Sequence, residues 1–196
     1  MNRDTDEILA LFRELDALLE GHFLLSSGRH SDTYFQCARV LQFPELAREL
    51  GRRLAERLAD GLELDAVVSP ALGALLLGHE VARAVGRRFL FTERVAGKMT
   101  LRRGFALEPG ERVLIVEDVI TRGTSTREVA AVVAACDATV AGVACLVDRT
   151  GGAVDLPAPP VSLLQVAAVS WEPGDCPLCR QGLPLVKPGS RETAAP

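Results

Sequence analysis

The chain has 196 residues, of which 48% are hydrophobic, and carries 22 basic against 26 acidic side chains, a formal net charge of −4. This length suits a single domain, and the hydrophobic content excludes a wholly disordered chain. The acidic balance argues against a nucleic-acid partner. We also expect no contact with a membrane, since no apolar run reaches the 18 residues that a span requires.

The first sixty residues predict two helices separated by a polar turn. Asp4 or Thr5 can cap the first helix, and Gly21 is expected to end it. Its apolar positions at helical spacing are Ile8, Leu9, Phe12, Leu15, Leu18 and Leu19. Residues 26–32 are rich in Ser, Gly and charged side chains and predict a turn. Pro44 suits the first turn of the second helix, whose apolar face carries Leu46, Leu50, Leu54 and Leu58.

Strand and helix patterns then alternate. We expect helices over 75–85 and 126–136, and strands or extended segments over 66–68, 88–91, 98–105, 112–116 and 140–147. Near-continuous apolar strands in such alternation predict an α/β fold with a parallel twisted sheet and helices on both faces. Ligands in this architecture bind outside the carboxyl ends of the strands.

The segment that follows has a different composition. Three prolines precede an apolar strand over 161–166, and a Cys-Pro-Leu-Cys motif follows at 176–179. We expect this tail to pack as an appendage and not to extend the core sheet.

The strongest chemical signal runs from Val113 to Ser125. An apolar strand delivers Glu117 and Asp118 to the sheet edge, and a loop rich in Thr, Gly and Ser then opens a helix. Backbone N–H groups at a helix N-terminus, together with hydroxyl donors, form an anion site that suits a phosphate monoester. The neighbouring acids suit sugar hydroxyls or a hydrated divalent cation. This combination describes a sugar phosphate site; the alternative is a plain strand end followed by a helix cap.

These thirteen residues resemble the phosphoribosyl-diphosphate signature of type I phosphoribosyltransferases. Residues 21–31, followed by Tyr34 and Phe35, are similar to the N-terminal segment of orotate phosphoribosyltransferases, and Val147-Asp148-Arg149 resembles the Asp-Arg of the same enzymes. The resemblance implies the type I fold in a single domain over 1–196. Its core would cover about 44–152, and a small hood would be formed by about 1–43 and 153–190.

The resemblance also implies a reaction: transfer of the phosphoribosyl group from 5-phosphoribosyl 1-diphosphate to orotate in pyrimidine biosynthesis, giving orotidine 5′-monophosphate and diphosphate. Glu117 and Asp118 would hold the ribose hydroxyls, and Asp118 would also be a catalytic residue. The rest of the phosphoribosyl site would be Val119, Ile120, Thr121, Arg122, Gly123, Thr124 and Ser125. Orotate would contact Thr121, Arg149, Tyr34, Phe35 and Arg29, since a guanidinium fork suits a carboxylate.

The leaving diphosphate would lie against a loop that includes Ala71 and Leu72. A mobile loop over 93–99, contributed by the neighbouring subunit of a homodimer, would bring the catalytic cations Arg94 and Lys98. Mg²⁺ is expected as the cofactor, held mainly through the substrate. Orotate is already anionic, so the reaction needs no strong base; stabilisation of developing charge and exclusion of water supply the catalysis.

Two features depart from the family pattern. Many orotate enzymes have a Lys just before Ser-Gly-Arg, where this chain has Ser26 or Ser27. The charge of orotate would then rest on Arg149, helped by Arg29. The mobile loop is also short and poor in Lys, which leaves open whether Arg94 or Lys98 is the essential cation.

Other interpretations stay open. The same fold could serve a purine base, or act as a non-catalytic regulator that senses phosphoribosyl diphosphate. Cys176 and Cys179 have the spacing of half a zinc site or of a redox pair, but two thiols in a tight turn is the favoured interpretation. His22, His30 and His79 are expected to be surface or loop histidines. An odd number of scattered cysteines favours a reducing, cytoplasmic location.

Overall fold

The computed structural model describes residues 3–25, 27–152, 154–166 and 169–188. Its helices are α1 (Arg3–Glu14), α2 (Ala38–Leu41), α3 (Pro44–Glu56), α4 (Leu75–Val85), α5 (Thr124–Ala134), the 3₁₀ turn η1 (Pro173–Asp175) and α6 (Pro177–Arg180). Its strands are β1 (Leu18–Leu24), β2 (His30–Phe35), β3 (Ala66–Pro70), β4 (Arg88–Val95), β5 (Lys98–Leu101), β6 (Arg112–Ile120), β7 (Thr139–Asp148), β8 (Pro160–Gln165) and β9 (Ser170–Trp171).

Six strands form the main sheet in the order β5-β4-β3-β6-β7-β8. All neighbours are parallel except β4 and β5, which form an antiparallel hairpin at one edge. The chain winds outward from β3 to β4 and then returns to the other side of β3 with β6. The carboxyl ends of β3 and β6 therefore flank a topological switch point, where ligands bind in open α/β sheets.

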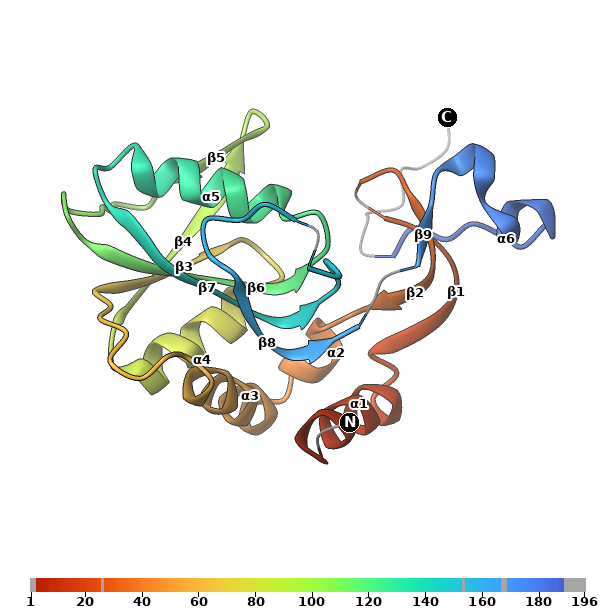
Figure 1. Ribbon diagram of the computed structural model, residues 1–196, viewed down its shortest axis with the longest axis horizontal. Coiled ribbons are helices and arrows are strands. Elements are labelled where there is room, and N and C mark those ends of the chain that lie inside the picture. The colour runs from red at the N-terminus through yellow and green to blue at the C-terminus, as the bar shows by residue number, and fades with distance from the viewer. Residues whose placement is uncertain (1–2, 26, 153, 167–168, 189–196) are drawn as a thin grey trace.

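Helices cover both faces of this sheet, as expected from the sequence (Figure 1). Side chains that alternate along β6 show which helices lie on which face. Leu114 and Val116 pack with α1, α3 and α4 on one face, whereas Val113 and Ile115 pack with α5 on the other. Successive residues of this strand are buried on opposite faces, which explains its unbroken apolar run.

The first helix is shorter than the sequence predicts. Asp16 adopts a left-handed conformation with φ 48°, and the N–H groups of Asp16 and Ala17 bond the carbonyl oxygens of Arg13 and Phe12. This Schellman arrangement ends α1 before the expected stop at Gly21. Leu18 and Leu19 then begin strand β1. The spacing of these two leucines fits the apolar face of a helix, but the left-handed turn at Asp16 ends the helix before it reaches them.

The prediction that residues 161–166 stay outside the core sheet was wrong. Strand β8 pairs in parallel with β7, and Leu163 and Leu164 are fully buried against α1 and α3. The strand is one more parallel element of the same sheet, because its apolar side chains cover surface that β7 would otherwise expose. The small sheet β1-β2-β9, with η1 and α6, forms a separate lobe that we call the hood (Figure 1).

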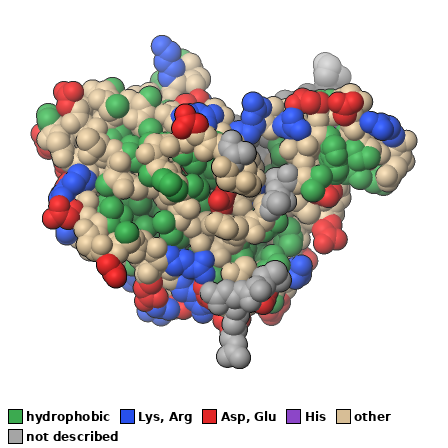
Figure 2. All heavy atoms as spheres, viewed as in Figure 1, with side chains coloured by type: hydrophobic (Ala, Val, Ile, Leu, Met, Phe, Trp, Pro, Cys, Tyr) green, Lys and Arg blue, Asp and Glu red, His purple; other side chains and the backbone are tan. Residues whose placement is uncertain are grey.

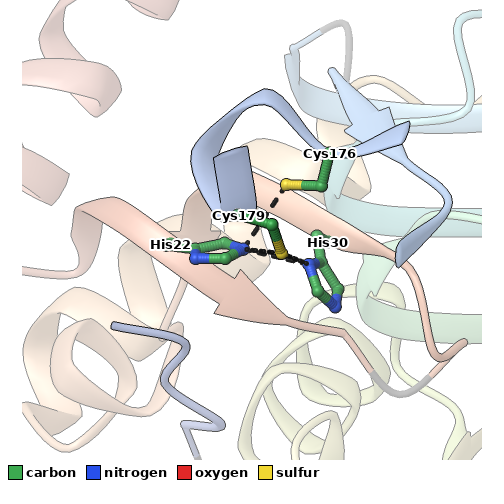
Figure 3. A group of neighbouring side chains, drawn as sticks. All are labelled: His22, His30, Cys176 and Cys179. Atoms are coloured by element: carbon green, nitrogen blue, oxygen red, sulfur yellow. Dashed lines mark hydrogen bonds between the residues drawn. The ribbon is translucent and has the colours of Figure 1, made fainter. Parts of the chain in front are cut away.

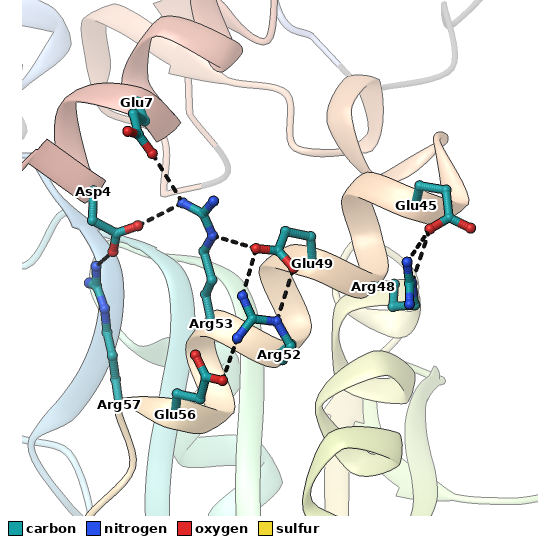
Figure 4. A network of polar contacts seen from close by, with 9 residues as sticks. All are labelled: Asp4, Glu7, Glu45, Arg48, Glu49, Arg52, Arg53, Glu56 and Arg57. Atoms are coloured by element: carbon teal, nitrogen blue, oxygen red, sulfur yellow. Dashed lines mark hydrogen bonds and ion pairs between the residues drawn. The ribbon is translucent and has the colours of Figure 1, made fainter.

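Ion pairs join α1 to α3 on the surface of the core (Figure 4). The Arg53 guanidinium bonds Asp4 of α1 at 2.7 Å and Glu49 of its own helix at 2.8 Å. Arg57 contacts Asp4 and also donates to the carbonyl oxygen of Ser162 in β8 at 2.6 Å. Asp4 therefore links α1 to α3 and does not serve as the expected N-cap, since the helix already begins at Arg3.

No helix in the described part of the chain combines the length and the apolar composition of a membrane span.

Candidate active site

A cavity of about 740 Å³ opens at the carboxyl ends of the central strands. It is lined by residues 117–126 together with Leu24, Leu25, Ser27, Tyr34, Phe35, Arg94, Arg149, Lys187 and Pro188. The core sheet contributes one side, and the hood and its following segment contribute the other. Figure 2 shows the surface hollowed between the larger body and the hood, with acidic and basic side chains near the hollow.

Two adjacent carboxylates form the floor of this cavity. Glu117 is 6% exposed, and Asp118 accepts a hydrogen bond from the N–H of Val119 at 2.9 Å. Burial raises the pKa of Glu117 well above its usual range, and the charge of Asp118 adds to this shift. Burial also raises the pKa of Asp118. Neither carboxylate has an ion-pair partner in the described part of the chain, so the pair is suited to accept hydrogen bonds from a ligand.

The loop after β3 lies directly against the acid pair. A Cβ on Gly73 would come within 2.4 Å of Asp118 Oδ2, so only glycine permits this approach. The Ala71–Leu72 peptide in the same loop is cis, and the Ala71 N–H donates to the Thr92 carbonyl oxygen. Leu72 is 82% exposed. Ala71 and Leu72 directly precede Gly73, which contacts the acid pair, but they are not among the residues that line the cavity.

The Thr/Gly/Ser loop has the geometry expected of an anion site. Gly123 is the residue directly before α5 and has a left-handed conformation with φ 64°. The loop therefore leads directly into the first turn of that helix. A side chain at Gly123 would also collide with Leu156, at 2.4 Å. The buried Thr126 hydroxyl lines the cavity and lacks a hydrogen-bond partner. Helix polarity, free N–H groups and hydroxyls therefore converge on one side of the cavity.

Arg149 provides a buried positive charge on the opposite side. It follows β7, is 4% exposed, and donates to Thr33 Oγ1 at 2.9 Å and Ser31 Oγ at 3.1 Å. Its guanidinium lies 5.5 Å from the centre of the Phe35 ring. Its Nε–H has no hydrogen-bond partner among the residues that the structure describes, and burial lowers the pKa of the guanidinium. No carboxylate among the described residues forms an ion pair with it. A buried cation of this kind favours an anionic ligand.

Strand β2 delivers the predicted aromatic residues. Tyr34 and Phe35 both line the cavity, and burial raises the pKa of the Tyr34 hydroxyl. Arg29, in contrast, is turned into the hood: its Nε donates to Ser170 Oγ at 3.0 Å, and its guanidinium also pairs with Glu172. Of the two residues expected at the place of the family's lysine, Ser27 lines the cavity, and Ser26 lies outside the described residues.

The segment predicted to be a mobile loop forms the hairpin β4–β5. Ala96 and Gly97 make its two-residue turn with φ 49° and 82°. Arg94 pairs across the strands with Met99, and Lys98 pairs with Val95. Arg94 and Lys98 therefore lie on opposite faces of the hairpin. Arg94 lines the cavity and pairs with Glu128, whereas Lys98 is exposed and does not line it.

Sequence reasoning missed Lys187, which lines the base of the hood side of the cavity. The preceding residue, Val186, joins β1 through two backbone hydrogen bonds of 2.8 Å, with the His22 carbonyl oxygen and the Leu24 N–H. This pairing brings a residue from a late segment of the chain beside an early strand. No local motif announces such a contact; its only signal in the sequence is that Lys187 is one of just two lysines.

The expectation of surface histidines was wrong for two of the three. His22 and His30 are 4% and 5% exposed, because the hairpin β1–β2 is covered by the segment that carries Cys176 and Cys179. His79 is exposed on α4, as expected. The two buried histidines, buried Cys176 and exposed Cys179 form a cluster of side chains that do not line the cavity.

Comparison with known proteins identifies the family. The phosphoribosyl transferase domain matches residues 37–178. An orotate phosphoribosyltransferase from Pelotomaculum thermopropionicum is 56% identical over 188 residues, which are 95% of this chain and 98% of that relative. The crystal structure of Mycobacterium tuberculosis orotate phosphoribosyltransferase with inorganic phosphate is 29% identical, with a TM-score of 0.63, and covers 85% of this chain and 98% of its own.

The fold alone does not select the base. An adenine phosphoribosyl transferase from Trypanosoma brucei, solved with AMP, pyrophosphate and ribose-5-phosphate, is only 18% identical but has a TM-score of 0.62 over 84% of this chain and 80% of its own. The near full-length sequence relationship is the more specific finding. The chain belongs to the orotate phosphoribosyltransferase family.

Proposed function

We infer that the chain transfers the 5-phosphoribosyl group from 5-phosphoribosyl 1-diphosphate to orotate, giving orotidine 5′-monophosphate and diphosphate. One observation carries this inference beyond family membership. A single cavity combines an acid pair whose Glu117 is buried, an anion-binding loop and a buried guanidinium that forms no ion pair with a described carboxylate. These three groups match the hydroxyls, the phosphate and the anionic base of the product.

The phosphoribosyl group is recognised by the end of β6 and the start of α5. Glu117 and Asp118 accept hydrogen bonds from the ribose 2′- and 3′-hydroxyls, and binding of these donors favours the ionised carboxylates that burial disfavours. The backbone and hydroxyls of residues 121–125 hold the 5′-phosphate at the helix N-terminus. The acid pair would repel a phosphate placed directly beside it. The separate positions of the acids and of the phosphate site therefore also fix which end of the sugar faces the base.

The base is recognised from the hood side. Orotate carries a carboxylate, which suits the guanidinium of Arg149, while Tyr34 and Phe35 offer aromatic surface to the pyrimidine ring. Lys187 supplies a second cation on that side, and we propose that it takes the role of the lysine that the family has before Ser-Gly-Arg. Its test is paired with that of Arg149 in the Discussion.

Catalysis rests on charge that develops as the bond to diphosphate breaks. The ribose ring becomes positive and the leaving oxygens become negative, so cations positioned for the leaving group lower the barrier. Of the two cations in the β4–β5 hairpin, Arg94 is the one that lines the cavity of its own chain. Orotate attacks as an anion, so no residue must remove a proton. The hood excludes water that would hydrolyse the sugar.

We propose Mg²⁺ as the cofactor, held through the substrate's diphosphate, with the acid pair nearby. Two adjacent carboxylates without an ion-pair partner fit a hydrated divalent cation. When bound, the ion neutralises charge on the leaving diphosphate. Omission of Mg²⁺ in the presence of a chelator is expected to abolish turnover; undiminished turnover would contradict this role.

We also propose a homodimer whose sites are shared. This is supported by the opposite faces of the β4–β5 hairpin, since a Lys98 that faces away from its own cavity is available to a second copy. A mixture of Lys98→Ala chains and Glu117→Gln/Asp118→Asn chains is expected to regain part of the activity that each lacks alone, because one site in the heterodimer is intact. Absence of recovery after verified subunit exchange would contradict sharing.

The proposed reaction is tested by the loss of orotate absorbance after 5-phosphoribosyl 1-diphosphate and Mg²⁺ are added to the purified protein. Adenine, guanine, xanthine and uracil serve as parallel acceptors. Turnover with orotate alone is the expected result. Turnover with a purine would replace the base assignment, and tight binding of the diphosphate substrate without turnover of any base would favour the sensing regulator.

A further inference from the structure

Four side chains of metal-binding type meet in the hood, three of them buried and Cys179 exposed (Figure 3). His22 lies on β1 and His30 on β2, while Cys176 directly precedes α6 and Cys179 lies within it. One ligand atom from each residue lies within 4.8 Å of all the others. The two cysteines are about 150 residues from the histidines in sequence, so the fold alone creates this cluster.

Three of the distances between these atoms match a tetrahedral zinc site. Bonds of about 2.0–2.1 Å to nitrogen and 2.3 Å to sulfur imply distances between ligand atoms of about 3.3–3.8 Å. The sulfur of Cys176 is 3.4 Å from His22 Nε2, and that of Cys179 is 3.7 Å from the same atom and 3.3 Å from His30 Nδ1. The two nitrogens are 2.9 Å apart and would separate slightly around a metal.

The orientation of the His22 ring is already fixed by a second contact. His22 Nδ1 lies 2.9 Å from the carbonyl oxygen of Leu183 and can act there only as a donor. The neutral imidazole then carries its lone pair on Nε2, the nitrogen that faces the cluster. Metal-binding histidines in proteins characteristically donate their other N–H to a backbone carbonyl in this way.

The hairpin explains how two histidines reach the same point. In the β1–β2 register Leu24 pairs with His30, and His22 lies two residues before Leu24. The register shifts between Glu20 and Phe23, so regular alternation does not fix the His22 side chain, but the 2.9 Å contact between His22 Nε2 and His30 Nδ1 shows that the two rings lie on the same face of the hairpin. The segment 176–179 packs over this face, and its Cys-x₂-Cys spacing is the one that zinc sites use.

We propose that His22, His30, Cys176 and Cys179 bind one Zn²⁺ within each chain as a structural site. Two imidazole nitrogens and two thiolates in a tetrahedral set select zinc among the common divalent ions. Four protein ligands leave no open position, so the ion takes no part in chemistry. On binding, the two thiols release their protons to solvent and form two Zn–S bonds, with no change of oxidation state.

The site gives the hood a stability that its small sheet lacks. Strand β9 has only two residues and β1–β2 is a single hairpin, an arrangement that is marginal without another restraint. The metal would join this hairpin to the segment 176–188. Because Val186 pairs with β1 and Lys187 follows it, the same restraint holds Lys187 at the cavity.

The primary test is the metal content of the full-length protein, purified without chelators and measured by inductively coupled plasma mass spectrometry. About one zinc per chain is expected. The Cys176→Ser/Cys179→Ser variant is expected to lose it, while Cys136→Ser, a matched thiol change outside the cluster, retains it. Zinc-free protein or iron in its place would overturn the proposal, and half an ion per chain would overturn a site contained in one chain.

A second measurement uses the unaltered chain and so does not depend on a variant that folds. Replacement of the metal by Co²⁺ under reducing conditions is expected to give the intense visible bands of tetrahedral cobalt and a thiolate charge-transfer band. Chelation is expected to lower the unfolding temperature of the wild type by about 5 °C or more, with no such shift for the double Cys variant. A Cys176–Cys179 disulfide in freshly reduced protein, or a cluster that takes up no Co²⁺, would contradict the proposal.

Discussion

Replacement of Glu117 and Asp118 by Gln and Asn is expected to reduce kcat/KM for 5-phosphoribosyl 1-diphosphate by about 10²–10⁴-fold. Each carboxylate loses a hydrogen bond from a ribose hydroxyl to a charged acceptor, a contact worth about 1.5–3 kcal/mol. Glu117 is buried and Asp118 is half-buried at the end of β6, where both line the cavity. Steady-state kinetics with orotate in excess measure the effect.

The matched control is Glu45→Gln, an acid-to-amide change on α3 at a residue that forms an ion pair with exposed Arg48. It is expected to leave the kinetics unchanged. If the acid-pair variant kept its kcat/KM within about twofold of the wild type, the carboxylates would not contact the sugar. A large loss of affinity in a protein that never turned over would favour the sensing regulator.

The same double substitution is expected to stabilise the protein at alkaline pH. Because burial raises the pKa of both carboxyls in the folded chain, the folded state binds more protons than the unfolded state above about pH 4, and stability falls as pH rises through that window. The amides have no proton to lose. The variant's gain in unfolding temperature over the wild type should therefore be small near pH 5 and larger near pH 8; a gain that shrinks with rising pH would contradict this assignment.

Replacement of Arg149 by Met is expected to reduce kcat/KM for orotate by about 10²–10³-fold while leaving the affinity for 5-phosphoribosyl 1-diphosphate within a few fold. The guanidinium makes charge-assisted hydrogen bonds, worth about 1.5–3 kcal/mol each, and orotate loses its fork-shaped partner. Arg149→Lys retains the charge without the fork and should fall between the two. Separate titrations of the two substrates measure the split.

Lys187→Gln provides a graded comparison for this result. Lys187 is exposed, so solvent screens its charge, and we expect the KM for orotate to rise by only about three- to tenfold. Arg83→Gln, which alters an exposed ion pair on α4, serves as the control for loss of a positive charge. If Arg149→Met instead weakened the diphosphate substrate and left orotate unaffected, the assignment of the two sides of the cavity would be reversed.

The parts of the site that are contiguous in sequence could be predicted. The strand over 112–116, its acid pair and the loop that opens α5 form one continuous motif, and the geometry follows from strand and helix formation alone. The parallel sheet with helices on both faces followed equally from the apolar strands. Tyr34, Phe35 and Arg149 lie at the cavity where the resemblance expected them.

The features that were missed depend on contacts between distant segments. Leu15, Leu18 and Leu19 fit a helical stripe, and only the left-handed turn at Asp16 shows that the last two belong to a strand. The 161–166 strand joined the core sheet because β7 offered it an open edge. The positions of Lys187 and of the Cys/His cluster depend on the packing of the C-terminal segment against the β1–β2 hairpin. No local sequence pattern predicts that contact.

The pairing of Val186 with β1 has a consequence for the order in which the site forms during synthesis. The groups for the sugar phosphate, residues 117–126, and the guanidinium of Arg149 are made first. Lys187 lies 38 residues further along the chain, which takes about 2–8 s to make at usual elongation rates. A growing chain therefore acquires its phosphate-binding surface and Arg149 before it makes the segment that closes the hood side of the cavity.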